Sequence, residues 1–146
     1  IIADNPKLNV RSSQLGVDIG QVPQPLVVVL DRRQRLIYAA DSAYELCQEQ
    51  QTLYWREDDL LNLLKHLVSE YQCYEVLVEA GASVAGSFLN QRLVDELVVY
   101  QAPCVLGSQA RAMVEVNPLS LAQQLRFQYT ESKLVGSDLK LTLQPL

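Results

Sequence analysis

The residues of this chain that are best placed to do chemistry are Glu79 and Gly81, which stand between two predicted elements. Residues 74–79 are predicted to form a buried strand, and residues 83–90 a short helix directly after it. In open α/β sheets, ligands bind beyond the carboxyl ends of the strands, and a helix that begins there presents free N–H groups suited to phosphate. Gly81 lets a ligand approach the backbone because it has no Cβ. The pattern therefore predicts a phosphate cradle, although it is also an ordinary structural connection of α/β proteins.

Other polar residues have a functional and a structural interpretation. Glu79 can bind a substrate hydroxyl or amine, or it can cap the following helix by accepting from its first N–H groups. Arg32, Arg33 and Arg35 follow the first predicted strand, where positive charge suits the 2′-phosphate of a dinucleotide; the alternative is a solvated turn. His66 is the only histidine, which argues against His-rich zinc hydrolase sites and Ser-His-Asp chemistry. The remaining class is chemistry that a bound cofactor performs, and hydride transfer is the reaction of that class that we expect.

Composition limits the classes of partner and the compartment. The 146 residues fit one domain, and a net charge of −5 argues against nucleic-acid or anionic-membrane partners, because both require a basic face. No apolar run approaches the roughly 20 residues that cross a bilayer, so we expect no membrane partner. Three cysteines without C-x-x-C spacing predict neither disulfides nor a metal site. We interpret them as reduced thiols at core positions in a cytoplasmic protein.

The elements predicted around these residues are those of an α/β domain. A β-branched apolar run at residues 25–31 predicts a strand buried on both faces, as in parallel sheets. Apolar residues at three- and four-residue spacing predict a helix over residues 57–72, with acidic residues in its first turn. The other predicted strands cover residues 51–54, 93–100, 125–135 and 138–144. The last two are expected to form an antiparallel hairpin that turns at Gly136.

Five short segments, taken in order, carry a resemblance that runs from residue 1 to the C-terminus. They resemble the motifs of one family. These motifs are A-D-D-P-x-L-x-x-R, Q-P-x-R-x-V-x-D, a strand–E-[GA]-G–helix segment, L-V-D-E-L followed by A-P-x-x-x-G, and the segment with which the family's sequences usually end. In this chain they read ADNPKLNVR at 3–11, QPLVVVLD at 24–31, LVEAG at 77–81 with AGSFL at 85–89, LVDEL at 93–97 with AP at 102–103 and Gly107, and VGSDL at 135–139. The family is the reductase domain of the bifunctional riboflavin-biosynthesis deaminase/reductase.

This resemblance implies both a fold and a reaction. The implied fold is three-layered and similar to dihydrofolate reductase, with a largely parallel central sheet flanked by helices and an antiparallel C-terminal hairpin. Residues 1–146 would form an N-terminally truncated reductase domain, without its first strands and without the deaminase domain, to which the family's zinc belongs. The implied reaction reduces the ribosyl group of 5-amino-6-(5-phosphoribosylamino)uracil to ribityl, with hydride from NADPH.

The resemblance also implies a site, residue by residue. Leu8, Arg11 and Glu79 fall at substrate positions, and Arg11 would pair with the ribose 5-phosphate, because a guanidinium fork suits phosphate. Glu79 is the candidate for a catalytic proton donor. The positions implied to contact NADPH are Asp4, Arg32, Gly81, Ala82, Ser83, Val84, Ala85, Gly86 and Ser87. Two positions depart from the motifs, since Asn5 replaces an Asp and Val27 stands where the family often has Arg.

Alternatives to an active reductase stay open. A chain that starts at Ile1 would leave an inner sheet edge open, and such an edge invites pairing with another chain. We therefore expect a homodimer or a swapped dimer, and weak or absent activity for this chain alone. One alternative function is a nucleotide-binding or interaction module without turnover, which the missing strands favour. The other is a related reductase of a pyrimidine or pterin substrate, against which Arg11 speaks if that substrate lacks phosphate.

Overall fold

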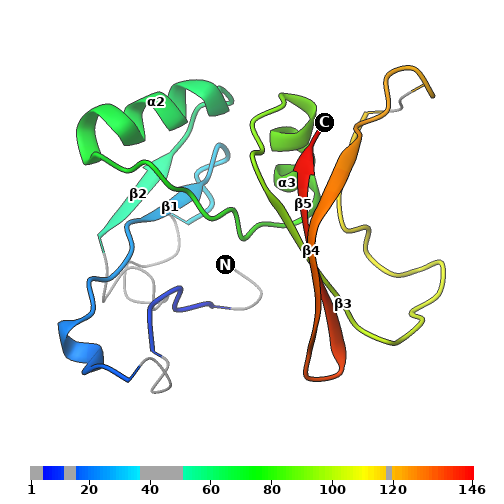
Figure 1. The fold of residues 1–146 in the computed structure, drawn as a ribbon. Coiled ribbons are helices and arrows are strands. Elements are labelled where there is room, and N and C mark those ends of the chain that lie inside the picture. The colour runs from blue at the N-terminus through cyan, green and yellow to red at the C-terminus, as the bar shows by residue number, and fades with distance from the viewer. Residues whose placement is uncertain (1–4, 12–15, 37–50, 118–119) are drawn as a thin grey trace. The chain divides into compact units, whose positions relative to one another are not determined.

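The computed structural model describes residues 5–11, 16–36, 51–117 and 120–146 (Figure 1). They form two compact units, Ile1–His66 and Leu67–Leu146, and each is described by itself. The elements in chain order are η2 (Ile19–Gln21), β1 (Val27–Leu30), β2 (Thr52–Trp55), α2 (Leu60–Tyr71), α3 (Ala82–Asn90), β3 (Leu97–Gln101), β4 (Phe127–Val135) and β5 (Asp138–Pro145). None of the helices in these described ranges is both long and apolar enough to span a bilayer.

The first unit is built on a parallel pair of strands, β1 and β2, which run in register from Val27 opposite Thr52 to Leu30 opposite Trp55. Val27 and Val29 are buried and form the centre of its core. The partly buried hydrophobic residues that pack against them are Leu8, Leu36 and Tyr54. The β-branched run thus forms the parallel strand that its composition predicts, with one face fully buried and the other half-buried.

Asp31, which is buried, ends β1 and organises the turn after it. Its carboxylate accepts hydrogen bonds from the N–H groups of Arg35 at 3.0 Å and Leu36 at 2.9 Å. Its carbonyl oxygen accepts from the N–H of Gln34, a residue with φ of +51°. Two backbone donors thus compensate the burial of this carboxylate, and they set the course of the arginine-rich turn.

Helix α2 begins three residues later than the apolar periodicity predicts. The carboxylate of Asp59 accepts from the N–H of Asn62 at 2.8 Å, as an N-cap does. The acidic residues therefore precede the helix, and the prediction that they occupy its first turn is wrong. The predicted apolar face is present, because the buried residues of α2 are Leu60, Leu63 and Leu67.

The segment 74–79 does not form the strand that its sequence predicts. It pairs with no strand among the described residues, and its side chains are exposed, with Tyr74 at 78% and Leu77 at 82%. The apolar run requires neighbouring strands to bury it, and the described residues contain none that flank it. Helix α3 follows at Ala82, within one residue of its predicted start.

The strands of the second unit form an antiparallel sheet in the order β3-β5-β4 (Figure 1). The predicted C-terminal hairpin is confirmed as β4 and β5, and Gly136 in its turn has φ of +62°. Because the described residues contain helices, a parallel strand pair and an antiparallel sheet, the fold is of the predicted α/β class. Parallel pairing is limited to β1 and β2 among the described residues, because the segment 74–79 adds no strand to it.

A backbone contact fixes a distant segment to the first turns of α3. The N–H of Glu115 donates to the carbonyl of Ala82 at 3.0 Å, and the hydroxyl of Ser83 donates to the carboxylate of Glu115. Gly86 is buried beneath the same segment, and a Cβ built on it would collide with the carbonyl of Glu115. The absence of a side chain at Gly86 is therefore what lets the Glu115 segment pack on the helix.

We expect Gly86→Ala to destabilise the domain by about 1–3 kcal/mol, as overpacking does, because the backbone of Glu115 must move. Gly81→Ala is the matched control, since no atom lies within 4 Å of a Cβ there and its φ of −71° suits alanine. Its free energy of unfolding should change by less than about 1 kcal/mol. Denaturant unfolding measures both values, and equal losses would contradict the packing role of Gly86.

Glu131 on β4 lies between two lysines. Its carboxylate oxygens are 3.2 Å from the Nζ of Lys133 and 3.3 Å from the Nζ of Lys140 on β5. Hydrogen bonds from Lys133, and then from Lys140, lower the pKa of Glu131 from its ordinary value of 4.5. The two lysines thus favour the charged form of this carboxylate.

A carboxyl group whose pKa is lowered by folding stabilises the folded state above its unfolded pKa. That contribution is lost as the pH falls through the folded pKa. We therefore expect Glu131→Gln to lower the midpoint of unfolding at pH 7, and the difference from wild type to vanish at acidic pH. NMR titration of the Glu131 carboxyl measures the folded pKa, and a value at or above 4.5 would contradict this account.

Candidate functional site

The amino end of α3 is open to a ligand. Its N-cap is Gly81, in an extended conformation with no side-chain cap, and the first intrahelical bond runs from the N–H of Ala85 to the carbonyl of Gly81. The three N–H groups before Ala85 have no acceptor within the helix, and the positive end of the helix dipole lies beside them. The alternative interpretation of Glu79 as the cap of this helix is wrong, because no side chain caps it.

A groove of about 540 Å³ lies at this helix end. The residues that line it are Ala80, Gly81, Ala82, Ser83, Val84, Arg111, Ala112, Met113 and Glu115. Four of them, Gly81, Ala82, Ser83 and Val84, belong to the predicted cofactor segment, and Ala80 directly precedes it. The other four come from the segment that Glu115 anchors to α3. Sequence reasoning missed this second wall, which has no motif and lies about thirty residues further along the chain.

The side chains of the predicted cofactor segment are largely engaged within the protein. The hydroxyl of Ser87 donates to the carbonyl of Ser83 at 2.9 Å, and the hydroxyl of Ser83 donates to Glu115. Gly86 has Glu115 as its close neighbour, where the sequence suggested a ligand. Ala85, Gly86 and Ser87 do not line the groove, and their role as cofactor residues stays a prediction. The donors that this segment leaves for a ligand are main-chain N–H groups.

In the first unit, Gln24 holds the segment that carries Arg11. Its side-chain carbonyl accepts from the N–H of Val10 at 2.8 Å, and its side-chain amide donates to the carbonyl of Val10 at 3.4 Å. The exposed guanidinium of Arg11 donates to the side chain of Asn9 at 3.0 Å. Gln24 is thus a positioning residue that sequence reasoning missed; its only signal was its place in the segment 24–31.

The remaining predicted residues of the first unit have different surroundings. Leu8 has φ of +49° and packs against the core, so a contact with substrate stays a prediction. Arg32 donates to Asp58 at 2.6 Å, and both side chains are mostly exposed. Exposed pairs of this kind are weak, so the guanidinium can exchange Asp58 for a phosphate. Asp4 lies outside the described residues.

His66, Cys73 and Cys104 do not line the candidate groove, and Cys47 lies outside the described residues. The ring of His66 lies 5.5 Å from that of Trp55, as a structural histidine can. Cys73 and Cys104 are free thiols, and Cys104 is exposed, which contradicts its predicted core position. Among the described residues, no group of three or more His, Cys, Asp or Glu side chains is arranged to hold a metal ion.

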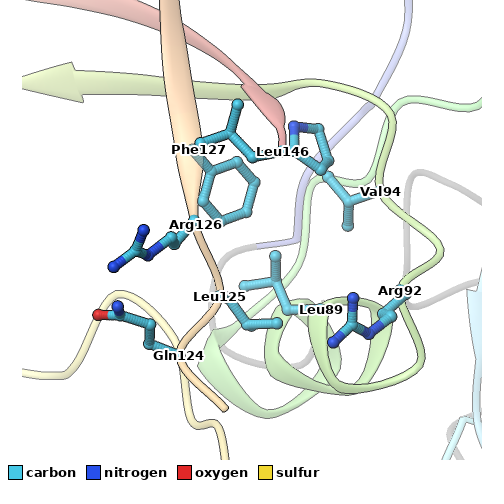
Figure 2. Close-up of a pocket in the computed structure, with 9 residues that line it drawn as sticks. Leu89, Arg92, Val94, Gln124, Leu125, Arg126, Phe127 and Leu146 are labelled. Carbon is cyan, nitrogen blue, oxygen red and sulfur yellow. The ribbon is translucent and has the colours of Figure 1, made fainter. Parts of the chain in front are cut away.

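A second pocket, of about 210 Å³, lies where the end of α3 approaches the ends of β4 and β5 (Figure 2). Hydrophobic side chains gather in it, among them Leu89, Leu125 and Phe127, and Figure 2 shows Arg126 extending away from them. None of the predicted site residues lines this pocket. The predicted residues instead fall into two groups, with Leu8, Arg11 and Arg32 on the first unit and Glu79 with the α3 segment on the second.

Comparison with known proteins gives consistent results. Residues 1–141 match the family model described as the RibD C-terminal domain. The riboflavin biosynthesis protein RibD of Haemophilus influenzae is 30% identical, over 99% of this chain and 45% of its own length. A 5-amino-6-(5-phosphoribosylamino)uracil reductase of Buchnera aphidicola is 26% identical, over 99% of this chain and 82% of its own length.

Among solved structures, form 1 of Acinetobacter baumannii RibD matches with a TM-score of 0.83 and 37% identity, over 99% of this chain and 44% of that one. The chain thus spans less than half the length of the RibD proteins that it resembles. The family model covers nearly all of this chain, and the solved structure shares its fold. The chain therefore belongs to the family of RibD C-terminal domains.

Proposed function

We propose that this chain is the NADPH-dependent reductase domain that converts 5-amino-6-(5-phosphoribosylamino)uracil to its ribitylamino product. The proposal rests mainly on the uncapped amino end of α3, which opens onto a groove of about 540 Å³. Membership of the RibD C-terminal family supports the reaction, and the name of the Buchnera aphidicola relative supports the substrate. The exposed Arg32 supports NADPH over NADH, because a 2′-phosphate requires a nearby cation.

The groove fits the diphosphate of a dinucleotide. Gly81 has open space around its Cα, so a phosphate can come within hydrogen-bonding distance of the main chain. The free N–H groups of Ala82, Ser83 and Val84 then supply donors at the positive end of the helix. When bound there, NADPH supplies the hydride, and the protein's task is to hold and orient both partners.

Arg11 is proposed to bind the 5-phosphate of the substrate. Its present partner is the neutral amide of Asn9, and a phosphate dianion is a stronger acceptor for a guanidinium. Gln24 holds the main chain at Val10 through two hydrogen bonds, so the backbone next to Arg11 is already in place before substrate binds. Anchoring of this kind lowers the entropy lost when substrate binds.

Glu79 is proposed to bind the sugar and to hold a proton. Opening of the ribosyl ring at C1′ gives an imine, to which a hydride adds at C1′ and a proton at nitrogen. The carboxyl group of Glu79 is exposed and has no hydrogen bond with the described residues, so it is available to a ligand. It lies two residues before Gly81, which places it next to the groove in the chain.

We further propose that the protein is a cytoplasmic homodimer. The segment 74–79 is exposed, apolar and unpaired among the described residues, and such a segment favours association with another chain. Free thiols at Cys73 and Cys104 suit a reducing compartment. The same segment favours a second candidate function, a nucleotide-binding module without turnover, because the segment before Gly81 pairs with no strand among the described residues. Binding of NADPH without its oxidation would select that function.

Arg11→Ala is expected to lower kcat/KM for the phosphorylated substrate by about 30- to 1000-fold, mostly through KM. Loss of one charged phosphate contact costs on the order of 2–4 kcal/mol. Steady-state oxidation of NADPH by the full-length protein, with the deaminated ribosylaminopyrimidine as substrate, measures the effect. Arg56→Ala removes an exposed arginine of the same unit that has no predicted role in the site and is the matched control, with less than about a threefold change expected. An unchanged kcat/KM in Arg11→Ala would remove the proposed phosphate contact.

A further inference from the structure

The groove at the amino end of α3 has a second wall whose chemistry the proposed cofactor site does not use. Arg111, Ala112, Met113 and Glu115 form that wall, opposite the segment that begins at Ala80. Among the described residues that line the groove, Arg111 is the only positively charged one. Its side chain is exposed, and it makes no ion pair or hydrogen bond with the described part of the chain. A groove for an anion therefore contains one cation with no partner in the described structure.

The segment that carries Arg111 has a local turn on one side and an anchor to α3 on the other. On one side, Gly107 has φ of +79° and its carbonyl accepts from the N–H of Ala110, which closes a turn just before Arg111. On the other side, Glu115 is bound to the first turn of α3 through its N–H and its carboxylate. Arg111 is thus placed near the helix end by the fold.

The charges that line the groove indicate that an anion bound there needs a further positive group. The carboxylate of Glu115 lines the groove and would repel a diphosphate, while the helix end contributes only about half a positive charge. The side chains of Arg111 and Glu115 do not pair with each other, although they share this wall. A diphosphate bound here would place a strong acceptor between the guanidinium and the helix N–H groups.

We propose that Arg111 binds the diphosphate of the dinucleotide, as the cation that complements the main-chain donors of α3. This inference rests on the proposed function and adds a residue to its cofactor site. The alternative target is the 2′-phosphate, which NADPH carries and NADH lacks. The position of Arg111 opposite the helix amides favours the diphosphate, which both dinucleotides share.

The test is the binding of NADPH and NADH to the full-length protein, measured by calorimetry or fluorescence. Arg111→Ala should raise Kd for both dinucleotides by about 10-fold or more, and by the same factor, because both lose one charged hydrogen bond. Arg111→Lys keeps the charge but loses the planar fork, so its Kd should lie between those of wild type and Arg111→Ala. Unfolding midpoints should stay at the wild-type value, since Arg111 is exposed.

Arg126→Ala is the matched control, because it removes an exposed arginine of the same unit that lies outside the α3 groove (Figure 2). Its Kd should remain within about twofold of wild type. Two results would overturn the diphosphate contact of Arg111 while the proposed function stands. In the first, Arg111→Ala binds both dinucleotides with the Kd of wild type; in the second, its Kd rises for NADPH alone. If wild type binds neither dinucleotide, the proposed function fails, and this inference fails with it.

Discussion

The candidate site depends on one contact, in which the main chain of Glu115 packs on the first turns of α3. A hydrogen bond to the carbonyl of Ala82 and the missing side chain of Gly86 make that close approach possible. The contact joins two segments that are remote in sequence, and it turns an exposed helix end into a groove with two walls. Without it, the helix N–H groups would face water on every side.

In the first unit, hydrogen bonds between side chains and the main chain position the segments that carry Arg11 and Arg32. Asp31 is buried and its carboxylate accepts from two backbone N–H groups, which sets the path of the turn that carries Arg32. Gln24 likewise satisfies both polar groups of Val10, next to Arg11. In each case a polar side chain pairs with backbone and leaves the neighbouring guanidinium exposed for a ligand.

Local patterns predicted the elements that find a partner strand or a core among the described residues. The β-branched run at β1, the apolar spacing of α2 and the alternation along β5 each became the element that their periodicity indicated. The segment 74–79 did not, although it contains the apolar run Val76, Leu77 and Val78. A strand needs partners for its main chain, and burial depends on what lies on both sides, so periodicity along the segment does not decide the outcome.

The sequence by itself determined the family, through the order of its motifs, and it located the glycine–helix junction at Gly81 and the phosphate-binding candidate Arg11. Tertiary structure alone decided the second wall of the groove. Arg111 belongs to no motif, and Gly86 was interpreted as a site for ligand approach, whereas its neighbour is Glu115. The physical reason is that a motif records local backbone geometry, while a groove requires two remote segments to be packed together.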